Sequence, residues 1–546
     1  MTSSRWRSFR DRLQQNYPQL QPTNPSYKWL VLGSVMIVTF MAVLDATIVN
    51  VAISKLMSSF GVSVDEVEWV LTAYLLIFGV VLPTSGWLAD HWGSKLVFSL
   101  GLILFTVGSF LCSLAWDLHA LIIFRIIQGA GAGLVMPVGL AIITREFPPE
   151  KRGIALAFWT VSASASVSLG PAMGGYLIDN YSWHAIFDIN VPIGIFGLAV
   201  ILTVLREQKA EIARRLDYIG FVTMSLGLAT LLLALASGNS AWNTGGWTST
   251  YILSCFAISV VSLTIFLITE LTVEHPLIEL SLFRHATFTI TNAVAFLFGL
   301  ALFGSTFLLP IYLQDSLGYT PLQAGLVFIP VGIIQGLVAP LAGLFSDRYS
   351  PKLPAFIGMV LMAITFYLLG HLSFLSEKPQ IMLPLYIRGV SIGLIFAPLT
   401  AMALSEISHK EIAQASGLLN VIRQIGGSFG VAVFGSLLTQ RTIYHMAIYG
   451  QQINSQSDAF RQTVSKLQGH VMQTGGVPFA NAGPQAKALI GSFVSNQAFI
   501  QAIDDVYLAA AAIILIGAFP VLFVRMRKRK APQPGAPQKP TSVAIK

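Results

Sequence analysis

Fourteen apolar stretches, each long enough to cross a bilayer as a helix, dominate this sequence. About 20 helical residues cross roughly 30 Å of hydrocarbon, and a helix bonds its own backbone polar groups there. Only 11% of the residues are charged, against roughly 25% in a typical soluble domain. The chain is therefore predicted to be an all-α integral membrane protein embedded in a lipid bilayer. The expected spans are 29–50, 67–89, 95–116, 118–141, 152–178, 185–205, 217–237, 249–270, 288–314, 322–346, 353–373, 380–405, 413–438 and 502–525.

The basic residues between the spans predict which side each loop faces. With the N-terminus inside, 24 of the 33 Lys and Arg residues fall in cytoplasmic tails and loops. This asymmetry is the one that the positive-inside rule describes. The first 28 residues lack the short apolar core and cleavage site of a signal peptide. We therefore expect a multi-pass protein with cytoplasmic N- and C-termini. The net charge of +8 requires no nucleic-acid partner, because the basic residues 525–530 can hold the last helix at the membrane surface.

Two pairs of similar segments indicate an internal repeat. "GWLADHWGSK" (86–95) and "GLFSDRYSPK" (343–352) share Gly, an Asp four residues later and a Lys nine residues later. "GAGAGLVMP" (129–137) and "GVSIGLIFAP" (389–398) recur at nearly the same offset. The offset relates spans one to six to spans nine to fourteen and leaves two helices as an insert. Paired six-helix halves with a site near the midplane are typical of one large class of secondary transporter.

The repeat divides the chain into five parts. They are a cytoplasmic N-terminal segment 1–28, a six-helix bundle 29–205, two inserted helices with linkers 206–285, a second six-helix bundle 286–525 that includes an outer loop 439–500, and a basic cytoplasmic tail 526–546.

Four motifs, taken in order, resemble those of the fourteen-helix drug:proton antiporters of the major facilitator superfamily. They are "LDATIVNVA" (44–52), "GWLADHWGSK" (86–95), "FRIIQGAGAG" (124–133) and "LGPAMGGYL" (169–177), and segments such as "FDINVPIG" (187–194) and "ASGLLNVIRQIGG" (415–427) look closest to the EmrB branch. The resemblance implies the major facilitator fold, with two pseudo-symmetric six-helix bundles plus two inserted helices. It implies proton-coupled efflux of hydrophobic, drug-like molecules by alternating access at the bacterial inner membrane. It also implies a periplasmic adaptor similar to EmrA and an outer-membrane channel similar to TolC.

Asp45 is a carboxylate within an otherwise apolar span. A charge at the bilayer centre costs roughly 2.5–3.5 kcal/mol on insertion scales, so such residues face the bundle interior and mark ion or proton paths. Asp45 is predicted to bind the coupling proton, and Arg125, which keeps its own proton, is its expected partner in the same bundle and modulates it. The alternative is a permanently ionised Asp45 that forms a structural ion pair.

Five residues are candidates for substrate contact. Asn50 and Gln128 extend the polar lining around the acid, the Phe-rich stretch 296–307 can form an apolar cavity, and Arg423 matches a family position. Ordinary interhelical hydrogen bonds, or phenylalanines facing lipid, explain the same pattern. The substrate candidates are Asn50, Gln128, Phe296, Phe303 and Arg423.

Two motifs are candidates for conformational roles. In the first, Gly170, Pro171, Gly174 and Gly175 predict a bendable, closely packed span five. The alternative is a static kink. The second is the loop motif and its repeat, which resemble a latch between the two bundles. Its residues are Gly86, Asp90, Gly93, Lys95, Gly343 and Asp347. An ordinary short basic loop is the alternative.

The outer segment 439–500 contains one amphipathic pattern. Phe460, Val464, Leu467 and Val471 recur at helical spacing and predict a helix within 458–473. This helix is expected either to dock the adaptor or to lie on the membrane surface.

Other classes of protein are disfavoured. The sequence has no phosphate-binding "GxxxxGK[ST]", no "HExxH" and no Cys/His metal set. We therefore expect no cofactor, no metal and no enzyme activity, with the proton gradient as the energy source. An importer of a small nutrient on the same fold, or a membrane receptor or enzyme, is the alternative.

Overall fold

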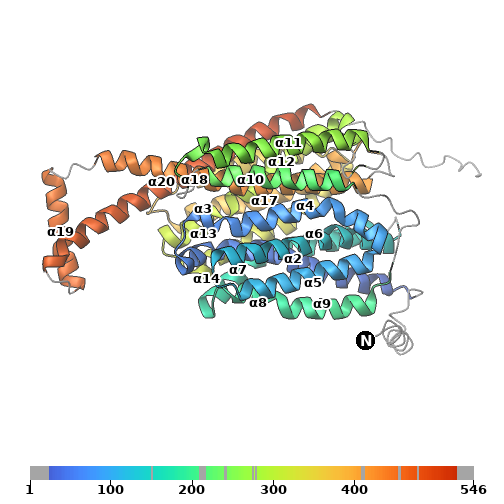
Figure 1. Ribbon diagram of the computed structural model, residues 1–546, viewed down its shortest axis with the longest axis horizontal. Helices are drawn as coiled ribbons and strands as arrows, with labels where there is room; N and C mark the ends of the chain where they lie inside the picture. Colours follow the sequence, from blue (N-terminus) through green and yellow to red (C-terminus); the bar gives the residue numbers. More distant parts are fainter. Residues whose placement is uncertain are drawn as a thin grey trace, which may run out of the picture.

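The computed structural model shows a bundle of long helices (Figure 1). It describes residues 24–148, 152–207, 217–238, 243–273, 276, 280–407, 412–452, 457–475 and 479–524. Most of the N-terminal segment and the whole basic tail lie outside these ranges. Every regular element within them is a helix, in agreement with the all-α class expected from the sequence.

The first bundle is built from long helices that end where the sequence supplies a break or a cap. α2 ends at Gly61, whose φ of 67° is accessible to glycine at little cost. α6 begins after Asp117, whose side chain accepts a hydrogen bond from the Ala120 amide at 2.7 Å. The elements are α2 (Tyr27–Phe60), α3 (Val64–Val67), α4 (Trp69–Trp92), α5 (Ser94–Ser113), α6 (Leu118–Glu146), α7 (Arg152–Asn180), α8 (Ala185–Asp188) and α9 (Asn190–Val204).

The second bundle repeats this plan, but its first two spans are each interrupted near one end. The first of its spans closes with a π-helical turn, and the second begins with a capping box at Thr320. The elements are η4 (Leu280–Arg284), α12 (Ala286–Thr306), α13 (Leu308–Ile311), η5 (Tyr312–Ser316), α14 (Pro321–Leu326), α15 (Ile329–Arg348), α16 (Lys352–Leu369), α17 (Lys378–Ala403), α18 (Ile412–Gln452), α19 (Asp458–Gly475) and α20 (Phe479–Phe523).

Two further helices lie between the bundles in the sequence. α10 (Tyr218–Ser237) and α11 (Thr250–Thr272) pack against each other and are joined through η3 (Gly246–Thr248), and α10 also contacts α18 and α4. Within the described residues, twelve helical stretches are long and apolar enough to cross a membrane. α4, of 24 residues, and α7, of 29, are also long enough, which agrees with the fourteen spans expected.

The two bundles meet at one end of the molecule, here called the α3 end because the α2–α3 turn lies there. Gln314 Nε2 donates to the Val51 carbonyl at 3.0 Å, and the Leu322 amide donates to Asp179 Oδ2 at 3.0 Å. Both bonds join the first bundle to the second. At the opposite end, a Cβ added at Gly86 or Gly343 would meet nothing within 4 Å. The bundles are therefore closely packed at the α3 end, whereas these two glycines of the repeated motif lie in open surroundings.

The segment 439–500 differs from the loop expected there. α18 continues to Gln452 and α20 begins at Phe479, so helix occupies much of the segment. The two helices extend past the bundle, and α19 lies across the far end of the extension (Figure 1). The sequence predicted helix in this segment only within 458–473; polar residues continue the two helices beyond their apolar spans.

α19 confirms the predicted amphipathic helix, but its apolar residues are covered. Phe460, Val464 and Leu467 are half-buried and Val471 is buried, and α19 packs against α20. Docking of an adaptor by α19 and a position of α19 on the membrane surface both stay predictions.

Candidate functional site

Asp45 lies near the middle of the 34-residue helix α2 and is fully buried. Its Oδ2 accepts a hydrogen bond from Arg125 Nη1 at 2.6 Å. Its Oδ1 accepts two more, from Gln128 Nε2 and Asn190 Nδ2, each at 2.8 Å. The contact between Asp45 and Arg125 expected from the sequence is therefore present. Three side-chain donors hold the carboxylate, which is the arrangement that makes a buried charge tolerable.

Arg125 is fully buried and, besides Asp45 of α2, contacts its own helix α6 and the neighbouring helix α4. On its own helix, Nη1 also bonds to Gln128 Oε1 at 2.7 Å. Nε donates to the Val70 carbonyl of α4 at 3.2 Å, and the guanidinium carbon lies 4.0 Å from the Tyr74 ring centroid. Nη2 is buried without a hydrogen-bond partner. The cation therefore has one donor group to spare, for a water molecule or a substrate acceptor.

Asn190 is the site residue that sequence reasoning missed. It begins α9, is fully buried, and bonds to Ser109 Oγ at 3.0 Å as well as to Asp45. Ser109 in turn donates to the Phe187 carbonyl at 2.9 Å. The sequence did contain a signal for it: Asn190 is a polar residue within the otherwise largely apolar segment "FDINVPIG". That segment supported the family resemblance, but no role was predicted for Asn190.

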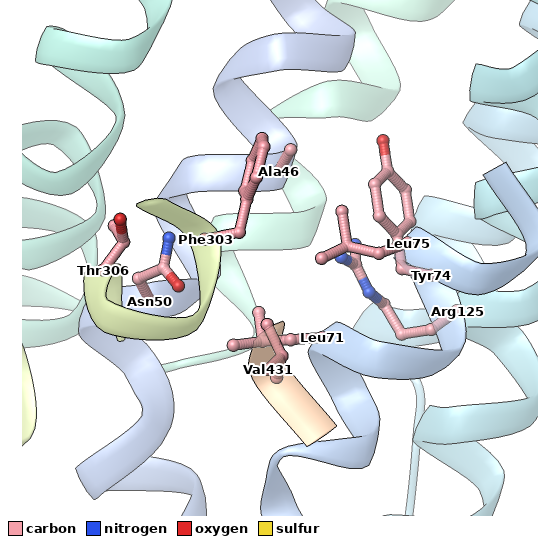
Figure 2. A pocket seen from close by; sticks show the side chains of 9 residues that line it. All are labelled: Ala46, Asn50, Leu71, Tyr74, Leu75, Arg125, Phe303, Thr306 and Val431. Atoms are coloured by element: carbon pink, nitrogen blue, oxygen red, sulfur yellow. The ribbon is translucent and has the colours of Figure 1, made fainter. Parts of the chain in front are cut away.

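A small cavity opens beside the ion pair (Figure 2). Its volume of about 20 Å³ is enough for about one water molecule. Both bundles line it: Ala46, Asn50, Leu71, Tyr74, Leu75 and Arg125 come from the first, and Phe303, Thr306 and Val431 come from the second. The charged site therefore lies at the interface between the two bundles, as expected for a transporter of this plan.

The five substrate candidates are distributed differently around this cavity. Asn50 and Phe303 line it. Gln128 is fully buried and bonds to Asp45 and Arg125, so in this conformation its amide serves the ion pair. Phe296 packs edge-on against Phe429, with ring centroids 5.6 Å apart.

Arg423, the fifth candidate, is on α18. Its Nη2 donates to Asn420 at 2.6 Å and its guanidinium stacks over the Phe396 ring at 4.1 Å. No carboxylate of the described residues pairs with it within salt-bridge distance. Substrate contact by all five residues stays a prediction.

The glycine motif of α7 connects the site to the bundle interface. A Cβ at Gly170 would collide with Thr47 Oγ1, and one at Gly174 would lie 2.7 Å from Ile48 Cγ1, both on α2 close to Asp45. Gly175 faces the other way: a Cβ there would collide with the Pro321 carbonyl of α14. Pro171 lies inside the helix, and its carbonyl is pressed against Gly325. α7 is thus closely packed between the helix that carries Asp45 and the second bundle.

Several hydrogen bonds of the loop motif 86–95 lie within the first bundle. Lys95 Nζ donates to the carbonyls of Leu202 and Leu205 of α9, at 2.6 Å each. Gly93 has a φ of 101°, and Glu207 accepts hydrogen bonds from the Lys95 and Leu96 amides beside it. Lys95 is thus bonded to α9 of its own bundle, and a latch between the two bundles stays a prediction. The side chains of Asp90 and Asp347 lie outside the described part of the chain.

The ion pair is not part of a metal-binding cluster of the described residues. Within the described ranges, no group of three or more His, Cys, Asp or Glu side chains is arranged to bind a metal ion. The groups around Asp45 are hydrogen-bond donors, from Arg125 and from the side-chain amides of Gln128 and Asn190. Such donors stabilise a carboxylate and do not bind a metal ion.

Comparison with known proteins agrees with this architecture. Residues 35–431 match the family model described as "Major Facilitator Superfamily". The "Multidrug export protein EmrB" of Haemophilus influenzae is 33% identical over 489 residues, covering 88% of this chain and 92% of that protein. The protein of the same name from Escherichia coli K12 is 31% identical over 506 residues, with 91% and 95% covered. The "Fatty acid resistance protein FarB" of Neisseria gonorrhoeae is 30% identical over 504 residues, with 92% and 96% covered.

A solved structure supports the fold. A bacterial homologue of the human lysosomal transporter Spinster, in an inward-facing and unoccupied conformation, aligns with a TM-score of 0.60 at 16% identity, covering 93% of this chain and all of that one. The chain is therefore a membrane-embedded secondary transporter of the major facilitator superfamily, not an enzyme. Within that superfamily it belongs with the EmrB-like proteins.

Proposed function

We propose that this protein exports bulky, mostly apolar compounds across the bacterial inner membrane in exchange for protons that bind at Asp45. One observation carries the proposal: a fully buried carboxylate, held by Arg125, Gln128 and Asn190, lies beside a cavity lined by both bundles. An intramembrane acid at such an interface is the usual place for a proton to enter a transport cycle. The similarity to multidrug export proteins supports the substrate class.

Arg125 is proposed to set when Asp45 takes up a proton. The guanidinium favours the ionised carboxylate, and burial favours the neutral one. A proton that binds Asp45 removes the charge that Arg125 Nη1 contacts at 2.6 Å. The ion pair then loses most of its electrostatic attraction, and α2 is free to shift against α6 and α9.

The packing of α7 provides a route from that shift to the rest of the molecule. Gly170 and Gly174 rest on Thr47 and Ile48 of α2, two and three residues beyond Asp45, and Gly175 rests on α14 of the second bundle. Because the contacts are so close, movement of α2 must displace α7. Displacement of α7 then loosens the contact between the bundles at the α3 end, which would face the periplasm if both termini are cytoplasmic.

The test is an Asp45→Asn substitution. Asparagine keeps the shape of the side chain and cannot ionise, so proton-coupled export should be abolished while expression is retained. Ethidium accumulation in cells, measured with and without a protonophore, reports export. Asp188→Asn, at an exposed position in the same bundle, is the matched control. Undiminished protonophore-sensitive export by Asp45→Asn would refute the proton assignment.

An assembly with a periplasmic adaptor similar to EmrA and an outer-membrane channel similar to TolC is part of the proposal. The projecting unit of α18, α19 and α20 supports it, since the unit extends from the α3 end beyond the bundle (Figure 1). Replacing residues 453–478 with a short flexible linker should abolish capture of the adaptor and leave drug binding intact. Unchanged capture would place the contact elsewhere.

Import of a small nutrient is the second candidate function. The fold alone permits it. Substrate that accumulates in cells in proportion to expression of the protein would favour import, whereas depletion of the same dye would favour export.

A further inference from the structure

Glu68 is a second buried carboxyl group, and it lies at the interface of the two bundles. It occupies the junction of α3 and α4 at the α3 end and has no exposed surface. Both of its carboxyl oxygens are buried without a hydrogen-bond partner. A Cβ at Gly435 of α18 would collide with Glu68 Oε2. The carboxyl group therefore fills the space left by a glycine of the opposite bundle.

The surroundings of Glu68 are apolar. Trp69 and Leu76 of α4 pack with Phe429 and Ala432 of α18 in one hydrophobic cluster beside this contact. The polar neighbour Thr72, one helical turn along α4, is also fully buried, and its hydroxyl has no hydrogen-bond partner. A separation of α4 from α18 would expose Glu68 and Thr72 together.

No cation is positioned to pair with Glu68 among the described residues. On α3, Asp65 is buried and of like charge, and Glu66 accepts hydrogen bonds from the Ser63 amide and hydroxyl. On α18, Arg441 and His445 both bind Asp505 of α20 at 2.6 Å. Arg423, also on α18, donates to Asn420 and stacks over Phe396.

On α6, which packs against α4, Arg125 is bonded to the Val70 carbonyl and paired with Asp45, and no salt bridge joins it to Glu68. α10 carries no charged residue, and on α2 Lys55 is exposed. The remaining charged groups of α2 and α4 are Asp45 on α2, Lys28 near the first residue of α2, and Asp90 and His91 at the far end of α4. A buried carboxylate without a partner costs several kcal/mol, so the group is stabilised in its neutral, protonated form while the bundles are closed.

We propose that Glu68 is a proton-operated gate residue, neutral when the bundles are closed at the α3 end and ionised when they separate there. Its proton enters and leaves on the side to which that end opens. It acts separately from the proton at Asp45, although it rests on the alternating access of the proposed function. Reclosure then requires Glu68 to regain a proton. The pH on that side thereby controls the return of the empty transporter.

The size of the effect follows from ordinary glutamate chemistry. A hydrated glutamate titrates near pH 4.3, so around neutral pH its neutral fraction falls about tenfold per pH unit. The ratio of closed to open molecules should therefore fall by up to about tenfold for each unit of rising pH.

The experiment measures that ratio in the full-length protein in lipid nanodiscs. Spin labels at Ser59, exposed at the end of α2, and at Leu375, 87% exposed in the second bundle, report the separation at the α3 end. Distance distributions are recorded from about pH 5.5 to about pH 7.5, a range above the ordinary titration of glutamate. The chain without the two introduced cysteines gives the background, because Cys112 and Cys255 are native.

The decisive comparison uses an Asp45→Asn background, which removes any contribution of Asp45 to the pH response. Asp45→Asn alone should keep the pH-dependent opening, and Asp45→Asn with Glu68→Gln should stay closed across the range. Asp65→Asn, the neighbouring buried acid, should retain the response. Identical profiles with and without Glu68→Gln, or loss of the response in Asp65→Asn, would overturn the assignment.

A second variant tests the same contact with Glu68 in place. Gly435→Ala fills the space that the carboxyl group occupies and should shift the population toward the open form at every pH. Gly450→Ala is the control on the same helix, because a Cβ there meets nothing within 4 Å. Populations in Gly435→Ala equal to those of the parent would overturn the proposal. Export by Asp45→Asn tests the proposed function separately, so failure of one assignment is distinguishable from failure of the other.

Discussion

Asn190 Nδ2 donates to Asp45 Oδ1 at 2.8 Å across 145 residues of sequence. This bond joins the first helix of the bundle to the last one. The same amide group is bonded to Ser109 Oγ at 3.0 Å, which fixes its orientation. The ionised carboxylate therefore depends on α9 as well as on the cation of α6, and a change in either helix position alters how well the charge is stabilised.

Replacing Asn190 by Leu should shift the pH dependence of export to higher pH. The substitution removes one hydrogen bond to a charged acceptor, worth about 1.5–3 kcal/mol. At 1.36 kcal/mol per pH unit, loss of that bond corresponds to a shift of the export profile by about one to two pH units, because the bond stabilises the charged carboxylate more than the neutral one. Drug-driven proton release from proteoliposomes, measured across pH, checks this. Asn180→Leu, at an exposed position, is the control, and an unshifted profile would contradict the role of Asn190.

The contrast between Asp45 and Asn190 shows how much of the site the sequence could predict. An acid in an apolar span requires a partner, and only three basic residues lie within the predicted spans, so Arg125 could be proposed. Gln128 followed because it lies three residues along the same helix. Asn190 could not be placed, since its role depends on how α9 crosses α2.

The same limit applies at the bundle interface and beyond it. Glu68 meets Gly435 only because α4 and α18 cross there. Fourteen spans and the helix α19 were readable from apolar runs and periodicity. The extensions of α18 and α20 were not, because a polar helix outside the membrane has the composition of a loop.

Arg125→Lys should reduce export about 10- to 100-fold without preventing insertion. A lysine ammonium is a single point of charge and cannot bond to Asp45, Gln128 and the Val70 carbonyl at once. The lost charged hydrogen bonds amount to about 1.5–3 kcal/mol each. Initial rates of dye efflux at equal protein level measure the effect. Arg441→Lys, at a partly exposed ion pair, should retain nearly full activity; equal losses in both variants would argue against a special role for Arg125.

Gly175→Ala and Gly325→Ala should favour separation of the bundles at the α3 end. Each added methyl group would collide with a backbone carbonyl of the other bundle. Overpacking of this kind costs about 1–3 kcal/mol, enough to change the ratio of closed to open molecules roughly 5- to 150-fold. The spin-label distance between Ser59 and Leu375 reports the change. Gly33→Ala and Gly336→Ala have room for a methyl group and should leave that distance unchanged; a shift of the same size in these controls would show that the tight contact is not the cause.

Leu467→Asp should release α19 from α20 while transport by the bundle persists. Leu467 belongs to the half-buried apolar stripe of α19 that packs against α20. An aspartate there loses the apolar contact and places an unpaired carboxylate against α20, which is unfavourable. The detached helix should be cleaved by added protease much faster than in the parent, by about tenfold or more, since proteolysis follows the population of the open form. Lys466→Asp makes a larger change of charge at an exposed neighbour and should leave the cleavage rate unchanged. If Leu467→Asp is cleaved no faster than Lys466→Asp, the packing of α19 on α20 does not hold the projecting unit together.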